Sequence, residues 1–277
     1  MALFSKHDKI NALIKSVSTM ILCLDIGNSH MHGGVFVKDQ LQFQFRKASK
    51  SGSSSDEFGV FLRAVLREND IDPKAINAIA LCTVVPEVLY SIAAACQKYF
   101  GIEPFILQAG VKTGLHIGYK NPQDVGADRI ANAIAVTQLY PNQDTIVVDL
   151  GTATTFCAIS ASKQYMGGVI LPGLKMSMTA LAAGASKLGS VEIQEKKQAL
   201  GKTTNDSIQS GLYFGTLGAI KEIIGQLQKQ SFHNKHPLII GTGGFTSIYR
   251  TADIFDEIIA DLVLKGLVLA YRMNFSS

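Results

Sequence analysis

The chain contains little charge. Asp, Glu, Lys and Arg make up 17% of its 277 residues, against roughly 25% in typical soluble domains. The formal net charge is +4, and residues 1–19 supply +2 of it, because Lys6, Lys9 and Lys15 are offset only by Asp8. No basic run is interleaved with aromatic side chains, so the composition argues against a nucleic-acid partner. A surface poor in charge instead indicates a face buried by self-association.

Signals for membranes and disulfide bonds are also lacking. The most apolar window, residues 76–96, is interrupted by polar residues and a proline, which predicts a strand and a helix rather than a membrane span. Residues 1–19 lack a long apolar core and a small-residue cleavage site, so we expect an extension rather than a signal peptide. The four cysteines form no CxxC pair and are expected to be buried free thiols of a cytoplasmic protein: Cys23, Cys82, Cys96 and Cys157.

Several common catalytic motifs are missing as well. The sequence contains no GxSxG, HExxH or Walker A pattern. His30 and His32 have a spacing that can bind a metal on a strand, but no third ligand is evident, so we expect no metal at this pair. Lys196 and Lys197 are expected to lie on a solvated face.

Two stretches of the chain share one plan. Residues 21–29 and 147–155 each consist of an apolar run, an Asp, one apolar residue, a Gly and then small polar residues. The aspartates, Asp25 and Asp149, would lie at strand ends, where a carboxylate can hold a hydrated divalent cation. The glycine exposes backbone amides that form an anion cradle with Ser or Thr hydroxyls. We therefore predict a duplicated phosphate-binding fold in which the two aspartates face each other across a cleft.

Apolar periodicity supports two similar α/β halves. The first half is expected to contain strands near 20–26, 33–37, 41–45, 76–82 and 105–107, with helices near 56–68, 86–100 and 127–140. The second is expected to contain strands near 145–150, 154–160, 165–170 and 238–241, with helices near 174–181, 206–228 and 262–273. The helix from 206 should be capped by Thr204 or Asn205. We divide the chain into an extension (1–19) and two domains (20–140 and 141–277).

A third motif is Gly126-Ala127-Asp128-Arg129, at the start of an expected helix. One interpretation is a plain helix cap. The other gives Asp128 the role of general base for a substrate hydroxyl, with Arg129 balancing charge on the substrate or a phosphate. The functional interpretation is favoured because Asp25, Asp128 and Asp149 are three carboxylates in apolar or Gly-rich settings of a charge-poor chain.

A fourth motif, Thr242-Gly243-Gly244, follows the expected strand at 238–241. It is either a tight turn or a place where a flat ring such as adenine approaches the backbone closely.

Taken in order, the four motifs resemble those of the type III pantothenate kinases of bacteria, a family that has also carried the name Bvg accessory factor. The similarity covers about residues 20–274. Further segments that look like this family are Gly167-Gly168, Pro172-Gly173, residues 207–211 and residues 264–267.

The resemblance implies a fold, an activity and partners. The fold would be a duplicated actin-like ATPase fold of two ribonuclease-H-like domains around an interdomain cleft, as in sugar kinases. The activity would be ATP-dependent phosphorylation of pantothenate to 4'-phosphopantothenate, the first step of coenzyme A biosynthesis. The enzyme would be a homodimer that needs Mg²⁺ and a monovalent cation, K⁺ or NH₄⁺.

The resemblance also implies roles for individual residues. The ATP phosphates would be held by Asp25, Ile26, Gly27, Asn28, Ser29, His30, Met31 and His32. Asp25 would also bind Mg²⁺ through a water molecule. Thr152 would be a further contact of ATP. Pantothenate would be bound by Tyr119, Gly126, Ala127, Asp128 and Arg129, and by Thr204 of the neighbouring subunit. Asp128 would be the catalytic base, and Asp149 would bind the monovalent cation.

Two positions depart from the family's pattern. Ser29-His30 stands where Thr-Asn is usual, and Cys157 stands where Asp is common, which could alter cation binding or affinity. Three alternatives stay open: a kinase for another small hydroxyl compound, a regulatory protein, and an ATP-binding scaffold without catalysis.

Overall fold

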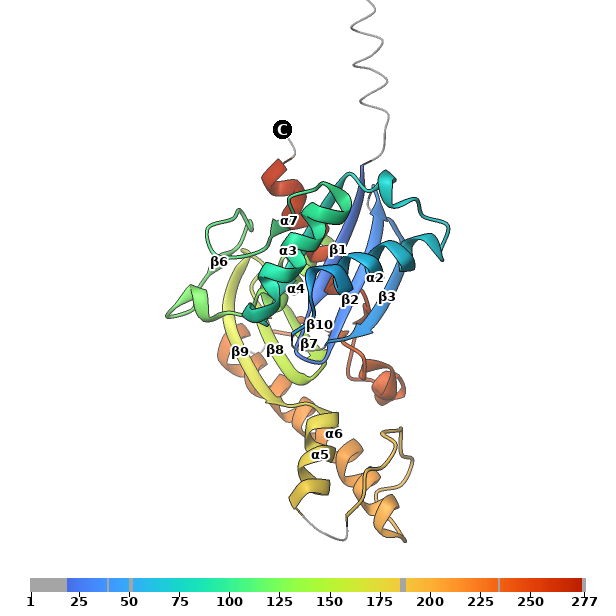
Figure 1. Cartoon of the computed structure of the whole chain (residues 1–277). Helices are drawn as coiled ribbons and strands as arrows, with labels where there is room; N and C mark the ends of the chain where they lie inside the picture. The colour runs from blue at the N-terminus through green and yellow to red at the C-terminus, as the bar shows by residue number, and fades with distance from the viewer. Residues whose placement is uncertain (1–18, 39, 50–51, 185–187, 234, 276–277) are drawn as a thin grey trace, which may run out of the picture. The chain divides into compact units, whose positions relative to one another are not determined.

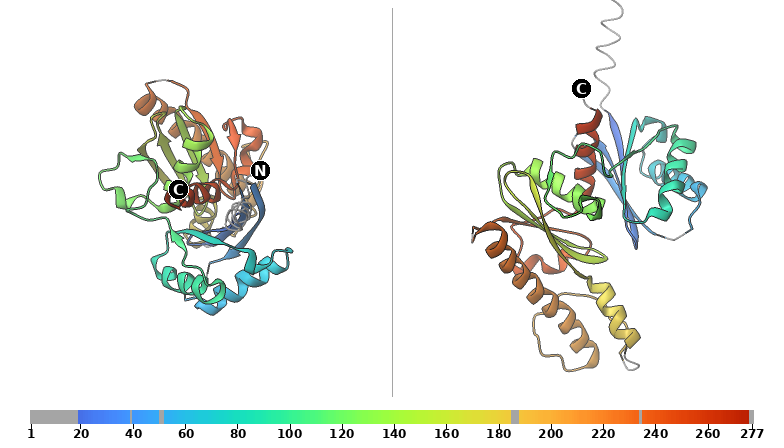
Figure 2. Two further views of the ribbon diagram at one scale, coloured as in Figure 1. Left: turned by 90° about the horizontal axis from the view of Figure 1, so that it is seen from above. Right: turned by 90° about the vertical axis from the view of Figure 1, so that its left-hand side faces the viewer.

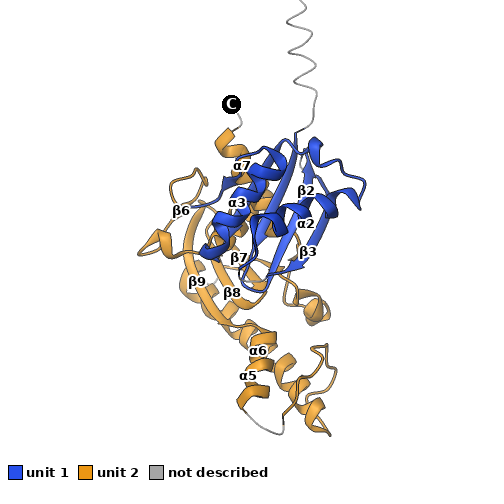
Figure 3. Cartoon of the chain, viewed as in Figure 1, with its two compact units in different colours: residues 1–108 blue, residues 109–277 orange. Residues whose placement is uncertain are grey.

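The structure is a computed structural model that describes residues 19–38, 40–49, 52–184, 188–233 and 235–275. The chain divides into two compact units, residues 1–108 and residues 109–277 (Figure 3). Nearly all of the predicted extension, residues 1–18, lies outside the described residues.

In the part of unit 1 that the structure describes, a five-stranded sheet is accompanied by two α-helices. Its elements are β1 (Met20–Ile26), β2 (His30–Val37), β3 (Gln40–Ala48), α2 (Ser55–Arg67), the short 3-10 helix η1 (Pro73–Ala75), β4 (Ala78–Thr83), α3 (Pro86–Phe100) and β5 (Phe105–Ile106). The strand order is β3-β2-β1-β4-β5. The first three strands form an antiparallel meander, and β4 and β5 run parallel to β1.

Helices α2 and α3 cover one face of this sheet, as Figure 1 shows. Ser54 caps α2 by accepting a hydrogen bond from the backbone N–H of Glu57, and the Glu57 side chain accepts from the backbone of Ser54 in return, so the predicted capping box is present. Buried residues of α2 such as Leu62 pack against alternate residues of β1, including Leu22 and Leu24. Burial of these apolar side chains is the main force that holds the helix on the sheet.

Unit 2 is a six-stranded sheet with four α-helices among its described residues. Its elements are β6 (His116–Ile117), the 3-10 helix η2 (Pro122–Asp124), α4 (Ala127–Leu139), β7 (Thr145–Leu150), β8 (Ala153–Ile159), β9 (Gln164–Pro172), α5 (Leu174–Gly184), α6 (Thr204–Phe232), β10 (Leu238–Thr242), the 3-10 helix η3 (Thr246–Ala252), β11 (Glu257–Ile258) and α7 (Leu262–Phe275). The strand order is β11-β10-β7-β8-β9-β6.

The two sheets repeat one topology. Strands β7, β8 and β9 form an antiparallel meander as β1, β2 and β3 do, and β10 and β11 run parallel to β7 as β4 and β5 run parallel to β1. Strand β6 is an addition that pairs with β9 at the edge. The duplication predicted from the paired Asp-x-Gly stretches is therefore confirmed in the strand order.

Helices lie on both faces of the second sheet. Ile146, Val148 and Leu150 of β7 pack against apolar residues of α6. The alternate residues of β7 and β8 face α4, which packs in turn on α7 (Figure 2). This helix pair is close, because a Cβ on Gly266 of α7 would come within 1.9 Å of the carbonyl oxygen of Ala131.

The contact of α4 with α7 places α4 in unit 2. The boundary between the units thus falls after Gln108, whereas the sequence-based boundary falls after residue 140. The domain division 20–140 and 141–277 stays a prediction, and it differs from the compact units by β6, η2 and α4.

Most predicted elements are present, and the differences concern ends and short pieces. Helix α6 runs from Thr204 to Phe232, and its cap is Thr203, whose hydroxyl accepts from the backbone N–H of Asp206. The prediction of Thr204 or Asn205 as the cap is therefore wrong by one or two positions. Strands β6 and β11 have two residues each, which is too short for an alternating pattern to reveal.

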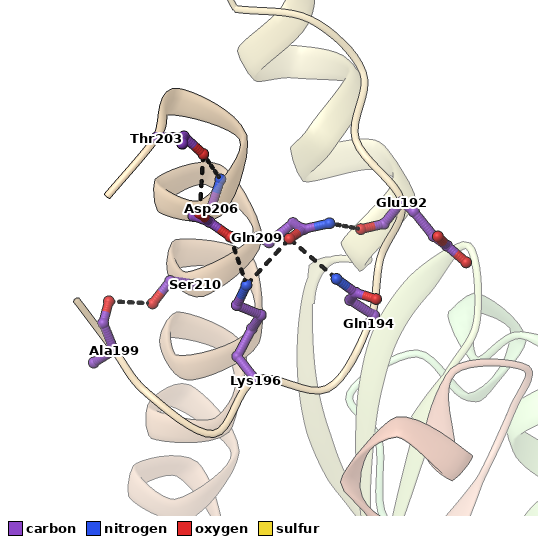
Figure 4. Close-up of polar contacts among 8 residues, drawn as sticks. All are labelled: Glu192, Gln194, Lys196, Ala199, Thr203, Asp206, Gln209 and Ser210. Atoms are coloured by element: carbon purple, nitrogen blue, oxygen red, sulfur yellow. Dashed lines mark hydrogen bonds and ion pairs between the residues drawn. The ribbon is translucent and has the colours of Figure 1, made fainter. Parts of the chain in front are cut away.

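Lys196 does not lie on a solvated face as predicted. Its ammonium group forms an ion pair with Asp206 at 3.0 Å and donates to Gln209 Oε1 at 3.2 Å (Figure 4). Lys197 is exposed as expected. The error arose because residues 188–203 have no regular secondary structure, so no periodicity shows which side chain meets α6.

Candidate active site

The Gly-Ala-Asp-Arg motif forms the first turn of α4. Gly126 is the N-cap and offers no side chain to the turn. Oδ1 of Asp128 accepts a hydrogen bond from the backbone N–H of Arg129 at 2.8 Å. Burial raises the pKa of Asp128, although the backbone hydrogen bond and the charge of Arg129 act in the opposite direction. The carboxylate is therefore a stronger base than a solvated aspartate.

The Arg129 side chain is buried, with 6% of its surface exposed. Its Nε donates to Sγ of Cys157 at 3.3 Å, and its guanidinium carbon lies 5.7 Å from the ring centroid of Tyr165. The Tyr165 hydroxyl donates to the same sulfur at 3.4 Å. Nη2 of Arg129 is buried without a hydrogen-bond partner in the described part of the chain. One donor of a fixed guanidinium is thus left for a ligand.

Tyr119 lies in the same neighbourhood, although it is far from Tyr165 in sequence. The segment after β6 is held by a hydrogen bond from the backbone N–H of Gly118 to the carbonyl of Tyr165 at 2.8 Å. The rings of Tyr119 and Tyr165 meet edge to face with centroids 6.3 Å apart. The structure thus places Tyr119 beside the aromatic ring over which Arg129 lies. Substrate binding by Tyr119 and by residues 126–129 stays a prediction.

Asp149 lies near the end of β7, where it contacts α4 and the Thr-Gly-Gly turn. Its Oδ2 accepts a hydrogen bond from Nδ2 of Asn132 at 3.2 Å. Thr242 of β10 is its direct neighbour in the parallel pairing. Gly243 has a φ of +92°, and a Cβ there would lie 2.4 Å from Oδ1 of Asp149. Glycine is therefore required both by the backbone conformation and by the approach of the carboxylate.

Asn132 is a residue of this region that the sequence analysis missed. It is 2% exposed, and its Oδ1 is buried without a hydrogen-bond partner among the described residues. Asn132 follows Arg129 by three positions and Asp128 by four, the spacing that puts side chains on one helix face. This spacing was available in the sequence as a signal.

Thr152 and Thr204 lie elsewhere in unit 2. Thr152 is exposed in the turn between β7 and β8, where its carbonyl accepts from the backbone N–H of Gly173 at 3.2 Å. Thr204 is exposed at the start of α6. That end of α6 lies beside α5, away from α4 (Figures 1 and 2). Within one chain, unit 2 therefore does not bring Thr204 to Asp128.

In unit 1 the first Asp-x-Gly stretch forms the turn between β1 and β2. Oδ1 of Asp25 accepts from the thiol of Cys82 at 3.4 Å. The turn is closed by a hydrogen bond from the backbone N–H of Gly27 to the carbonyl of His30 at 3.0 Å. Ser49, after β3, supports it through a hydrogen bond from its hydroxyl to the Gly27 carbonyl at 2.8 Å. The expectation that Asp25 faces Asp149 across a cleft stays a prediction.

The two histidines of this turn differ in environment. His30 is exposed, whereas His32 is 6% exposed and its Nε2 lies 3.1 Å from Oε1 of Gln44. The described residues contain no group of three or more His, Cys, Asp or Glu side chains that could hold a metal ion.

A cavity of about 540 Å³ adjoins the turn within unit 1. Its lining includes Gly27 and Asn28 of the turn together with Lys47, Ser49 and Glu87. The ammonium group of Lys47 lies 5.2 Å from the ring centroid of Phe58. The volume is in the range of small-molecule sites.

The duplicated fold has relatives among solved structures. A Campylobacter jejuni protein described as a Baf family transcriptional activator matches with a TM-score of 0.59 at 22% identity, over 91% of this chain and 98% of its own. A Sinorhizobium meliloti protein described as a 2-dehydro-3-deoxygalactonokinase matches with a TM-score of 0.55 at 15% identity, over 93% and 97%. Together with the repeated strand order, this defines the chain as a member of the actin-like ATPase and sugar kinase fold class.

Sequence comparison gives the family. The model of the type III pantothenate kinase family matches residues 21–226. The type III pantothenate kinase of Legionella pneumophila (strain Paris) is 55% identical over 255 residues, which are 92% of this chain and 99% of the relative. That of Elusimicrobium minutum is 45% identical over 257 residues, or 93% and 100%. The chain therefore belongs to the type III pantothenate kinase family.

Within its described part, no helix has the length and apolar character needed to cross a membrane.

Proposed function

We propose that this chain catalyses the ATP-dependent phosphorylation of pantothenate to 4'-phosphopantothenate, the first step of coenzyme A biosynthesis. Family membership and the actin-like fold support the reaction. The single observation that carries it is the first turn of α4, where a partly buried carboxylate of raised pKa precedes a buried guanidinium with a free donor. A base and a fixed cation side by side are what transfer of a phosphoryl group to a hydroxyl of an anionic acceptor requires.

Asp128 is the residue that takes the proton from the acceptor hydroxyl. Its Oδ1 is engaged by the backbone of Arg129, so Oδ2 is the oxygen that we assign to the substrate. The raised pKa increases the affinity of the carboxylate for this proton. In a loose transition state little base strength is needed, and the larger contribution is orientation of the hydroxyl.

The ATP phosphates are assigned to the glycine turn between β1 and β2, at residues 25–32. Asp25 ends a buried strand and is followed by a turn whose backbone is fixed by Ser49, which suits a rigid phosphate cradle. When bound, Mg²⁺ neutralises phosphate charge, and a single carboxylate such as Asp25 fits an ion that keeps most of its waters. Thr152 and the Thr-Gly-Gly turn are assigned to the remainder of the nucleotide.

Asp149 is assigned to the monovalent cation. Its carboxylate is fixed by Asn132 and enclosed by Gly243, and the buried Oδ1 of Asn132 is a further neutral oxygen without a partner among the described residues. One carboxylate with neutral oxygens is a donor set suited to an ion of single charge. Asp149 and Asn132 would hold this cation, which would supply positive charge at the turn after β7.

A homodimer is part of the proposal. Thr204 lies away from Asp128 within the chain, as a residue that serves the neighbouring subunit would. Helix α5 beside it is largely exposed although rich in apolar residues, and Met176 and Leu181 are 48% and 43% exposed. Burial of this helix against a second copy would remove an apolar surface from water.

A cytoplasmic location is also proposed, and four buried free cysteines support a reducing compartment.

The test is release of ADP by the purified chain with ATP, Mg²⁺ and K⁺, in the presence and absence of pantothenate. We expect pantothenate-dependent turnover. Asp128→Asn keeps the side-chain shape and should lower kcat by about 10²–10⁴-fold. Asp124→Asn is the matched control, because Asp124 is exposed and bonded only to Asn121 at 2.8 Å in the described contacts, and it should keep full activity.

The same assay separates the alternatives. Turnover with another hydroxyl compound but not with pantothenate would assign a different acceptor. Binding of ATP without turnover of any acceptor would point to a scaffold or a regulatory protein. Full activity of Asp128→Asn would remove the role given to this carboxylate.

A further inference from the structure

The carboxylate of Asp25 is held by a side chain of the neighbouring strand. In the parallel pairing of β1 with β4, Asp25 and Cys82 are direct partners. The thiol of Cys82 donates a hydrogen bond to Oδ1 of Asp25, with 3.4 Å between sulfur and oxygen. Cys82 is fully buried, so water does not compete for this thiol. The contact therefore restricts the orientation of the carboxylate that we assign to hydrated Mg²⁺.

Asp25 and Cys82 lie on the face of the sheet that is opposite to α2 and α3. Their neighbours along the strands, Leu24 and Ile26 of β1 and Leu81 of β4, belong to the apolar cluster beneath these helices. Successive side chains of a strand point to opposite faces, so Asp25 and Cys82 point away from that cluster. A buried cysteine usually serves as a small apolar residue, but this thiol is directed at a carboxylate instead.

The end of β4 also fixes the backbone at the end of β1. The hydroxyl of Thr83 donates to the carbonyl of Ile26 at 3.1 Å, and the backbone N–H of Val84 donates to the same carbonyl at 3.2 Å. These two bonds hold the main chain where the glycine turn begins. They do not act on the side-chain torsions of Asp25, whereas the bond from Cys82 does. Backbone and carboxylate are thus held by different residues of one strand.

The second copy of the turn uses a different donor. Oδ2 of Asp149 accepts from the side-chain amide of Asn132, and the strand neighbour of Asp149 that corresponds to Cys82 is Thr242 of β10. A thiol is a weaker hydrogen-bond donor than an amide. It therefore orients the carboxylate of Asp25 while leaving more of the negative charge for a ligand, which suits a doubly charged ion.

We propose that Cys82 is a positioning residue for the metal, because its thiol holds the Asp25 carboxylate in the orientation that receives a hydrated divalent cation. This inference rests on the proposed function, since it concerns the metal of the same nucleotide site. Cys82 itself contacts neither the metal nor the nucleotide. Removal of such a supporting partner typically lowers metal affinity by about 10–100-fold, and a weak donor places the expected effect at the lower end.

The experiment compares Cys82→Ala, which removes the donor, with Cys82→Ser, which keeps one. The free Mg²⁺ concentration for half-maximal activity should rise by about tenfold in Cys82→Ala, and Cys82→Ser should restore most of the difference. KM for pantothenate should stay unchanged in both variants. Cys96→Ala is the matched control, because Cys96 is an equally buried thiol of the same unit that packs in the cluster beneath α2 and α3. It should leave the Mg²⁺ dependence as in the native chain.

A second readout does not depend on catalysis. Calorimetry measures the binding of AMP-PNP, an ATP analogue, once with Mg²⁺ and once with EDTA. We expect Cys82→Ala to lower the affinity by about tenfold with Mg²⁺ and to leave the affinity in EDTA unchanged, because the thiol acts only through the ligand of the metal. Equal losses under both conditions would show a deformed turn rather than a misplaced carboxylate, and they would overturn the inference.

The remaining outcomes separate this inference from the proposed function. Equal Mg²⁺ dependence of Cys82→Ala and Cys82→Ser would overturn it, and so would a native affinity for AMP-PNP that is the same with Mg²⁺ and with EDTA. If Cys82→Ala does not fold, Cys82→Val and Cys82→Thr share one shape and differ in the donor, and the same contrast is expected between them. If the native chain phosphorylates no acceptor, the proposed function fails, and the binding of AMP-PNP still tests Cys82.

Discussion

Asn132 donates a hydrogen bond from Nδ2 to Oδ2 of Asp149 over 3.2 Å, and this bond joins α4 to the end of β7. Helix α4 begins with Ala127, Asp128 and Arg129, and β7 ends at the glycine turn whose Asp149 we assign to the monovalent cation. The contact therefore ties the position of the proposed base to the position of the proposed cation ligand. It has direct consequences for mutants of either element.

Replacement of Asn132 should weaken both stability and cation use. Asn132→Ala removes a buried bond to a charged group, and we expect the free energy of unfolding to fall by about 1.5–3 kcal/mol. The K⁺ concentration for half-maximal activity should rise, because Asp149 loses a group that fixes it. Gln138→Ala on the exposed side of the same helix is the control and should change neither quantity. A stable Asn132→Ala enzyme with unchanged K⁺ dependence would contradict the assignment.

The raised pKa of Asp128 predicts a pH-dependent gain in stability for its amide variant. A carboxyl whose pKa is higher in the folded than in the unfolded state stabilises the fold below its unfolded pKa, and this contribution is lost as pH rises through the folded pKa. At neutral pH the native protein therefore carries a penalty that Asp128→Asn lacks. We expect a higher Tm for Asp128→Asn than for the native protein at pH 7, with the difference shrinking as the pH is lowered below the folded pKa.

Thermal unfolding followed by circular dichroism, in a pH series from neutral down to the ordinary range of an aspartate pKa, measures this difference. Asp124→Asn should show no such trend, since its side chain is exposed. A lower Tm for Asp128→Asn across the whole range would show that the hydrogen bond to the helix start outweighs the burial of charge.

The contacts of Lys196 with α6, which are drawn in Figure 4, should hold residues 188–203 on this helix. It contacts Asp206 and Gln209, and Gln209 also donates to the carbonyl of Glu192 at 3.0 Å. Lys196→Ala removes the ion pair and one of the bonds to Gln209. We expect faster amide hydrogen exchange in residues 188–203, because opening of this segment then breaks fewer contacts.

The matched control is Lys197→Ala, which removes the same side chain one residue further along, where it is exposed. Exchange in residues 188–203 should be unchanged in that variant. Equal exchange in both variants would mean that the ion pair seen between Lys196 and Asp206 contributes nothing to holding the segment. A higher salt concentration should also accelerate amide exchange in residues 188–203 of the native protein, because salt screens the ion pair.

A shared active site predicts that two inactive variants complement each other. Thr204→Glu places a negative charge at a helix start, which the helix tolerates and an anionic acceptor does not. Asp128→Asn lacks the base. If each site uses Asp128 of one subunit and Thr204 of the other, every mixed dimer has one intact site, and random reassociation should restore about a quarter of the native sites. No recovery after unfolding and refolding of the mixture would contradict a shared site.

Local signals account for most of the fold. The apolar runs at β1, β7 and β10 are short, continuous and buried, and the capping box of Ser54 and Glu57 marks the start of α2. These features act within one turn or one strand, so they can be recognised without knowledge of the neighbours. The two Asp-x-Gly turns were recognised for the same reason, since their chemistry lies in consecutive residues.

Contacts between distant segments could not be predicted in this way. Lys196 was expected to be solvated, and its ion pair with Asp206 arises only because an irregular segment folds back on α6. Asn132 was overlooked because its partner, Asp149, is on a different element. The contact of Tyr119 with Tyr165 likewise requires β6 to pair with β9, and a two-residue strand leaves no pattern.

The sequence by itself determined the duplicated α/β plan, the two carboxylate-glycine turns and the Asp128–Arg129 pair, because each depends on residues that are close along the chain. Tertiary structure alone decided that Arg129 lies against the neutral sulfur of Cys157 and that Asn132 holds Asp149. Burial then determined the raised pKa of Asp128 and the unpaired donor of Arg129, since both follow from the removal of water by segments that meet only in the fold.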